Sequence, residues 1–324
     1  MRSAGRTSHV ATRRSMVVST AIVACLAIAV ASSAAWATWS SPRPGTPREV
    51  ARLVAKSKAI SVLPASPDPT LQDLAVNNVQ HIYPQAANGC STATQCDFGD
   101  LAAHRTIVLF GDSHARMWLP SLIPYAKSSH YKVVLLWLSA CPAASVSVWN
   151  VTTNVPYTSC DTWRKATIAL MDSMRPTLVL MASHTTRVYT SKGPTTLFTS
   201  AQWEQGDLKT IRELQKGRTK VALIGDITAL TLDVPQCLAA YPTKVQNCSV
   251  PNPNAGVAGF YRAEALAAKA TGITYLNPTP WLCTKTCSTV IGHFLVYTDN
   301  NHISLVFAEY LSTVFGDDVK KLAS

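Results

Sequence analysis

Five short apolar runs, separated by helical patterns, constrain the fold of this chain more than any other feature. Between the runs, apolar residues recur at helical spacing, as in residues 161–174, 203–216 and 259–270. Strands that are apolar almost throughout are buried on both faces, which is typical of a parallel sheet covered by helices on each side. The sequence therefore predicts an α/β fold of three layers, α/β/α, around a mainly parallel sheet. The predicted strands are residues 106–110, 132–138, 177–183, 220–227 and 273–278.

The N-terminal region has the composition of an export segment. Four arginines stand among the first 14 residues, and residues 16–37 are uncharged, apolar and end in Ala-x-Ala. This stretch predicts either a signal peptide cleaved after Ala37 or a retained membrane anchor, because about 20 apolar residues span a bilayer. Residues 12–18 also partly match a twin-arginine export signal. In each case the rest of the chain is predicted to lie outside the cytoplasm, in the cell envelope, either tethered by one span or secreted.

Positive charge is concentrated at the N-terminal end. Of the 29 Lys/Arg and 18 Asp/Glu residues, nine basic and one acidic lie in residues 1–58, so the remainder carries 20 basic and 17 acidic residues. The basicity therefore belongs to the export segment and the adjoining residues, and no nucleic-acid partner is predicted. Residues 38–70 are rich in Pro, Ser and Arg, which predicts a linker. The predicted organisation is an export segment (1–37), a linker (38–75) and a folded domain (76–324).

Eight cysteines follow the export segment, and an even number in an exported chain predicts up to four disulfides. Their clustering favours pairs of sequence neighbours, each closing a single loop, although eight cysteines allow 105 connectivities. A zinc site is the alternative, but Cys283-x-x-x-Cys287 has no second close Cys/His pair. No metal or other cofactor is predicted. The expected disulfides are Cys90–Cys96, Cys141–Cys160, Cys237–Cys248 and Cys283–Cys287.

The first predicted strand ends on Gly-Asp-Ser, residues 111–113, at the edge where α/β folds bind ligands. A serine hydroxyl becomes a nucleophile only when a base removes its proton and a third group orients that base. Asp299 and His302 stand three residues apart just before the predicted last helix, residues 303–322. One turn can hold both, with the carboxylate against one ring nitrogen and the other nitrogen directed at Ser113.

Two alternatives remain for these motifs. Gly-Asp-x-His after a strand is also found in metallophosphatases, but that fold requires an Asp-x-His pair upstream of Gly111, and none occurs. The acid and imidazole beside Ser113, Asp112 and His114, are interpreted as structural, hydrogen-bonding the local backbone or packing beneath the hydroxyl. A non-catalytic domain that binds envelope glycans is the alternative from a different class of function.

An early Gly-Asp-Ser with a late Asp-x-x-His resembles the SGNH, or GDSL-type, hydrolase superfamily, whose fold is flavodoxin-like. More narrowly, the chain is similar over about residues 80–320 to the extracytoplasmic SGNH domain attached to acyltransferase-three membrane proteins. The segments that carry this resemblance are FGDSHARMWLP (110–120), LWLSACP (136–142) and DNNHISLVFAEYL (299–311), with YPQAANGCSTATQCDFGD (83–100) and VALIGDITALTLDVPQC (221–237) in support.

The resemblance implies serine-dependent acyl transfer on cell-envelope glycans, as an O-acyltransferase or an acetylesterase. It assigns Ser113 as nucleophile, His302 as general base and Asp299 as the carboxylate that orients it. It places the oxyanion hole at the backbone N–H of Ser113, at Ser139 and at His184, which stands where the superfamily has Asn. The substrate would be an envelope polysaccharide or glycolipid, with a separate membrane acyltransferase as the possible acyl donor.

Overall fold

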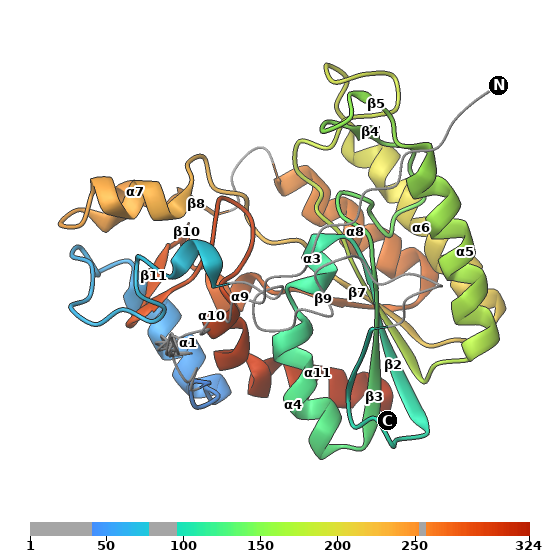
Figure 1. Cartoon of the computed structure of the whole chain (residues 1–324), viewed down its shortest axis with the longest axis horizontal. Helices are drawn as coiled ribbons and strands as arrows, with labels where there is room; N and C mark the ends of the chain where they lie inside the picture. The colour runs from blue at the N-terminus through green and yellow to red at the C-terminus, as the bar shows by residue number, and fades with distance from the viewer. Residues whose placement is uncertain (1–40, 78–95, 253–256) are drawn as a thin grey trace, which may run out of the picture. The chain divides into compact units, whose positions relative to one another are not determined.

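The computed structural model describes residues 41–77, 96–252 and 257–324, and residues 41–324 belong to one compact unit. The predicted export segment and Cys90 lie outside the described residues. A six-stranded sheet with the order β1-β3-β2-β6-β7-β9 forms the centre of the unit (Figure 1). Its strands are β1 (Cys96–Gly99), β2 (Arg105–Gly111), β3 (Tyr131–Trp137), β6 (Leu178–Ala182), β7 (Val221–Ile224) and β9 (Thr274–Leu276).

Five of these strands are parallel and correspond to the five predicted apolar runs, whereas β1 was not predicted and pairs antiparallel with β3 at one edge. Along β2, Ile107 and Leu109 enter one hydrophobic core while Val108 and Phe110 enter the other. This alternation of buried residues is why the strand reads as continuously apolar.

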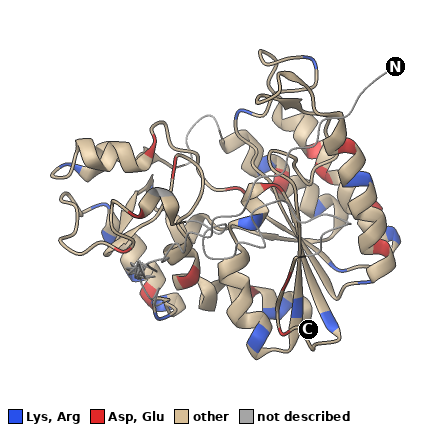
Figure 2. Ribbon diagram, viewed as in Figure 1, with Lys and Arg blue, Asp and Glu red and all other residues tan. Residues whose placement is uncertain are grey.

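Helices cover both faces of the sheet, as the apolar strands require. Helices α4 (Leu119–Ser128) and α11 (Ser312–Ala323) pack on one face. Helices α5 (Thr158–Met174), α6 (Ser200–Lys216) and α8 (Ala258–Thr271) pack on the other (Figure 1). The predicted three-layer fold with a mainly parallel sheet is confirmed. Figure 2 shows that the outer surfaces of α5 and α6 carry both Lys/Arg and Asp/Glu.

The remaining elements are short. They are α1 (Pro47–Ser57), η1 (Leu74–Val76), α3 (Ser113–Arg116), β4 (Trp149–Asn150), β5 (Val155–Pro156), α7 (Val234–Ala240), η3 (Val245–Cys248), β8 (Val250–Pro251), α9 (Thr279–Leu282), β10 (Thr286–Cys287), β11 (Val290–Ile291), β12 (Phe294–Leu295) and α10 (Leu305–Tyr310). The single last helix expected over residues 303–322 is thus two, α10 and α11, with Leu311 between them.

The segment expected to be a linker is packed into the compact unit instead. Thr46 and Glu49 form a capping box at the start of α1, and Pro47 occupies its first turn. Val50 and Val54, four residues apart and therefore on one face of the helix, are buried in the core. The linker was predicted from the Pro- and Arg-rich composition of this segment. That composition hides a short apolar stripe and a helix cap, and these two features are what fold the segment into α1.

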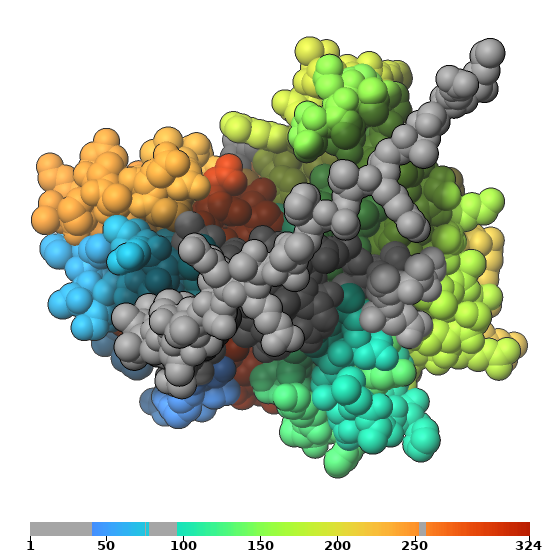
Figure 3. All heavy atoms as spheres, viewed as in Figure 1, coloured from blue at the N-terminus to red at the C-terminus, as the bar shows by residue number. Residues whose placement is uncertain are grey.

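The chain after α1 also lies against a distant segment. The backbone N–H of Leu63 donates to the carbonyl of Pro242 at 2.7 Å, and that of Val245 donates to the carbonyl of Ser61 at 2.9 Å. Figure 3 accordingly shows the light-blue surface of the chain after α1 side by side with the orange surface around α7. Among the described residues, no helix combines the length and apolar character needed to cross a bilayer.

Three of the expected disulfides are present: Cys141–Cys160, Cys237–Cys248 and Cys283–Cys287. The first ties the loop after β3 to the start of α5, and the second joins α7 to η3. Each pair joins cysteines 4 to 19 residues apart, so each closes a local loop as predicted. The fourth expected pair, Cys90–Cys96, includes a residue outside the described part of the chain and stays a prediction.

Candidate active site

Ser113 lies at the carboxyl end of the central strand β2, at the first residue of helix α3. The carboxylate of Asp112 caps this helix by accepting the backbone N–H of His114 at 2.8 Å. Gly111 makes the turn possible: its φ is +151°, and a Cβ there would overlap the carbonyl oxygen of Ala182 on the neighbouring strand. Asp112 is therefore structural, as expected, and the turn lifts the Ser113 hydroxyl above the sheet edge.

The structure brings Ser113, His302 and Asp299 together although 189 residues separate the first two. His302 Nε2 lies 2.8 Å from Ser113 Oγ, and His302 Nδ1 lies 2.7 Å from Asp299 Oδ2. Because a carboxylate only accepts, the ring proton is on Nδ1 and Nε2 is left to accept the serine proton.

The Asp299 carboxylate is fixed by contacts to both of its oxygens. Besides the His302 ring at Oδ2, its Oδ1 accepts the backbone N–H groups of Asn301 and His302, both at 2.8 Å. Burial acts to raise the pKa of Asp299, but the His302 hydrogen bond and charge and the two N–H groups outweigh it, so the pKa is lowered. The group is thus an ionised carboxylate suited to orient an imidazole and stabilise its protonated form.

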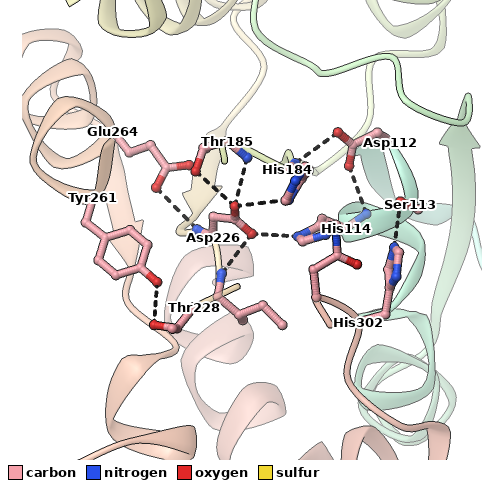
Figure 4. Close-up of polar contacts among 12 residues, drawn as sticks. Asp112, Ser113, His114, His184, Thr185, Asp226, Thr228, Tyr261, Glu264 and His302 are labelled. Carbon is pink, nitrogen blue, oxygen red and sulfur yellow. Dashed lines mark hydrogen bonds and ion pairs between the residues drawn. The ribbon is translucent and has the colours of Figure 1, made fainter. Parts of the chain in front are cut away.

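A second histidine–carboxylate pair lies beside the first (Figure 4). Asp226 follows strand β7, and its Oδ1 accepts from His114 Nδ1 at 2.6 Å. Its Oδ2 accepts both the N–H and the hydroxyl of Thr185, at 2.8 and 2.9 Å. Burial disfavours the charged forms of Asp226 and His114. The opposite charge and the hydrogen bond that each group receives from the other outweigh this effect. The pKa of Asp226 is lowered to about 2 and that of His114 is raised, which describes a buried ion pair.

His114 lies between two other imidazoles. Its ring centroid is 4.9 Å from that of His302 and 4.5 Å from that of His184. The buried pair with Asp226 therefore holds an imidazole directly against the ring that faces Ser113. Asp226 was not predicted as part of the site, although a signal existed: Gly225-Asp226 follows an apolar strand in the same way as Gly111-Asp112.

Two more acids are buried behind Asp226. Glu264 Oε2 accepts the backbone N–H of Asp226 at 3.2 Å, and Figure 4 shows this side chain reaching from α8 toward the pair. Burial, together with the charges of Asp207 and Asp226, raises the pKa of Glu264 well above its usual value. Burial alone raises the pKa of Asp207 to about 8. The raised pKa values favour the neutral form of both carboxyls, which limits the negative charge beside Asp226.

His184 was predicted to be part of the oxyanion hole. It follows β6, and its backbone N–H donates to Asp112 Oδ2 at 2.9 Å. Its Nδ1 is buried 3.6 Å from Asp226 Oδ2 and has no hydrogen-bond partner among the described residues. Burial, followed by the charge of His114, lowers the pKa of His184 to about 4, so the ring is neutral near pH 7 and has one donor and one acceptor nitrogen. Its role in the oxyanion hole stays a prediction.

Ser139 follows β3 at the same edge of the sheet and is exposed, with its carbonyl accepting from Tyr157 Oη at 3.3 Å. Its role in an oxyanion hole stays a prediction, as does that of the Ser113 backbone N–H. The latter is at the start of α3, where N–H groups have no partner within the helix and can face an anion.

His114, His184 and Asp226 also form a group of potential metal ligands, with one ligand atom from each within 4.8 Å of the others. Ligand atoms around a tetrahedral zinc, each about 2.0–2.1 Å from the metal, lie about 3.3 Å apart. The 2.6 Å between His114 Nδ1 and Asp226 Oδ1 is a hydrogen-bond distance instead. The cluster is therefore arranged as a hydrogen-bonded ion pair and not as a ligand set.

Comparison with known proteins identifies the family of the chain. A family model described as "SGNH domain (fused to AT3 domains)" matches residues 82–317, which is most of the chain. The chain belongs to this family. The predicted resemblance is thereby confirmed, and the chain is an SGNH domain of the hydrolase and acyltransferase type.

Among solved structures, this SGNH domain is similar to a lipopolysaccharide acetyltransferase periplasmic domain from Salmonella ser. Paratyphi A. The two are 15% identical over 68% of this chain and 86% of the other, with a TM-score of 0.54. A GDSL-like lipase from Bacteroides thetaiotaomicron VPI-5482 is 13% identical over 76% of this chain and 98% of its own, with a TM-score of 0.41. At these identities the likeness concerns the fold. Comparison with curated proteins gave no match.

Proposed function

We propose that this SGNH domain is a serine acyl-transfer enzyme that acts on cell-envelope glycans outside the cytoplasm. The observation that carries the proposal is the hydrogen-bonded chain from Asp299 through His302 to Ser113, with distances of 2.7 and 2.8 Å. These three side chains have the geometry that nucleophile, general base and orienting acid require. The family of SGNH domains fused to AT3 domains supports the substrate class and the extracytoplasmic location.

In the proposed mechanism, Ser113 Oγ attacks the carbonyl carbon of an ester as His302 Nε2 takes the hydroxyl proton. The tetrahedral intermediate collapses, the bond between the carbonyl carbon and the alcohol oxygen breaks, and His302 gives its proton to the departing alcohol. The acyl group is then on Ser113 Oγ. An incoming hydroxyl attacks this ester and loses its proton to His302, which returns it to Ser113 as the acyl group leaves.

Asp299 holds the ring of His302 through both half-reactions and stabilises the positive charge that forms on it. The incoming hydroxyl determines the direction of the reaction: water makes the domain an acetylesterase, whereas a sugar hydroxyl makes it an O-acyltransferase. As a transferase, the domain would receive its acyl group from a separate membrane acyltransferase, a partner that the description of the family supports.

The first experiment is turnover of p-nitrophenyl acetate, with fluorophosphonate labelling of the folded protein. Ser113→Ala should abolish both turnover and labelling, because the variant lacks the hydroxyl that forms the ester. Ser173→Ala is the matched control, since Ser173 is exposed on α5 and bonds the carbonyl of Leu170 in its own helix. A folded wild-type protein that takes no label would instead indicate a non-catalytic glycan-binding domain. Glycan ester content in cells with and without the gene distinguishes the directions, falling on deletion for a transferase and rising for an esterase.

A further inference from the structure

A pocket of about 380 Å³ opens beside the loop that carries Asp299 and His302. Asn300 and Asn301 line it, and these two residues lie between Asp299 and His302 in the chain. The opposite walls come from the segments after β6 and β7 and from strand β8. The backbone N–H of Leu230 donates to the carbonyl of Asn300 at 2.7 Å, which fastens the segment after β7 to the triad loop. A molecule bound here would therefore contact the loop that carries Asp299 and His302.

The pocket has one charged side chain among its described lining residues, Arg187. Arg187 is exposed and takes part in none of the ion pairs found in the described part of the chain. Its backbone φ is +58°, in the left-handed region that residues other than glycine seldom adopt and that is enriched at functional sites. The backbone is therefore strained at Arg187, the residue that places a cation in the pocket wall.

Hydrogen-bonding groups line the same pocket. His184 contributes a neutral imidazole, which has one donor and one acceptor nitrogen. The amide side chains of Asn300 and Asn301 each offer both donors and acceptors. Leu230, Val250 and Pro251 complete the wall with apolar surface. A predominantly apolar wall with a few convergent polar groups is typical of a small-molecule site.

We propose that this pocket binds the sugar whose hydroxyl gains or loses the acyl group, and that this sugar carries an anionic group that pairs with Arg187. The inference rests on the proposed acyl-transfer function. A carboxylate or a phosphate would fit, since the guanidinium binds both through paired N–H groups. The C–H face of the ring would pack on the apolar wall, and a ring hydroxyl would hydrogen-bond the His184 imidazole.

Direct binding tests this proposal independently of catalysis. Glucuronate, glucose 6-phosphate and glucose are titrated by calorimetry into the purified protein in low salt. We expect at least one of the two anionic sugars to bind about tenfold more tightly than glucose, since one charge-assisted contact is worth about that factor. Binding of glucuronate alone identifies a carboxylate as the recognised group, and binding of glucose 6-phosphate alone identifies a phosphate.

Arg187→Gln should remove this preference, whereas Arg187→Lys should retain part of it. Arg175→Gln is the matched control: Arg175 is also exposed with a positive φ, +49°, but it precedes β6 and so lies at the opposite end of that strand. Equal affinity for charged and neutral sugars, no binding of any of the three, or an equal loss in the two glutamine variants would overturn the proposal. Binding that persists in a protein whose Ser113 takes no fluorophosphonate would refute the catalytic function and leave the anion site intact.

Discussion

The imidazole of His114 packs against that of His302, with the ring centroids 4.9 Å apart and the planes at 59°. His302 is therefore held from two sides, by a hydrogen bond to Asp299 and by contact with a ring that is itself paired with Asp226. The two carboxylates reach their histidines differently. Asp299 is three residues from its partner in the chain, whereas Asp226 is 112 residues from His114 and meets it only in the folded protein.

Replacing Asp226 by Asn should destabilise the fold strongly. The change leaves a buried imidazolium without its counter-charge, and breaking a buried pair in this way costs on the order of 3–5 kcal/mol. Asp318→Asn is the control, because Asp318 pairs with Lys321 at the surface, where such pairs contribute about 0–1 kcal/mol. Urea unfolding monitored by circular dichroism measures both. Similar losses for the two variants would contradict the assignment of a buried ion pair.

Asp207→Asn should stabilise the protein at neutral pH and flatten its pH dependence. The folded protein keeps the proton on Asp207 up to about pH 8, whereas the unfolded chain releases it near pH 4. Between these values the folded state binds more protons, so stability falls as pH rises, by up to about 1.4 kcal/mol per pH unit. The measurement is the free energy of unfolding of both proteins from pH 4 to 8. Parallel curves would show that Asp207 does not carry a buried proton.

Asp299→Asn should leave the fold intact and reduce ester turnover by about 10⁴-fold, as in other triads, because the amide favours the wrong tautomer of His302. Steady-state kinetics with p-nitrophenyl acetate measures the loss, and fluorophosphonate labelling of Ser113 should slow in parallel. Asp318→Asn again serves as the control and should retain full turnover. A loss of only a few-fold would reduce Asp299 to a structural role.

Gly111→Ala should destabilise the protein by several kcal/mol or displace Ser113, because the added Cβ overlaps the Ala182 carbonyl of a buried neighbouring strand. Gly193→Ala separates steric overlap from backbone strain: Gly193 has a similar φ, +141°, but a Cβ there has nothing within 4 Å. We expect the control to lose about 1 kcal/mol. Thermal unfolding and turnover of both variants provide the comparison, and equal effects would show that strain alone determines the cost.

The strands and the Asp299–His302 pair were predictable because their signals are local, whereas their meeting with Ser113, 189 residues away from His302, was predicted from the resemblance of the motifs to a known superfamily. Each parallel strand is a run of apolar residues, and Asp299 reaches His302 within one turn. The features that were not predicted depend on contacts between separate segments of the chain. Asp226 meets His114 across 112 residues, and β1 reads as Cys-Asp-Phe-Gly, a segment that becomes a strand only by pairing with β3.

The two edges of the sheet are both short, with four residues in β1 and three in β9. A short edge strand has few unpaired backbone N–H and C=O groups with which a strand of a second molecule could pair. Such short edge strands favour a protein that stays dispersed when it is abundant. Light scattering of concentrated samples should accordingly show no growth of large particles over time.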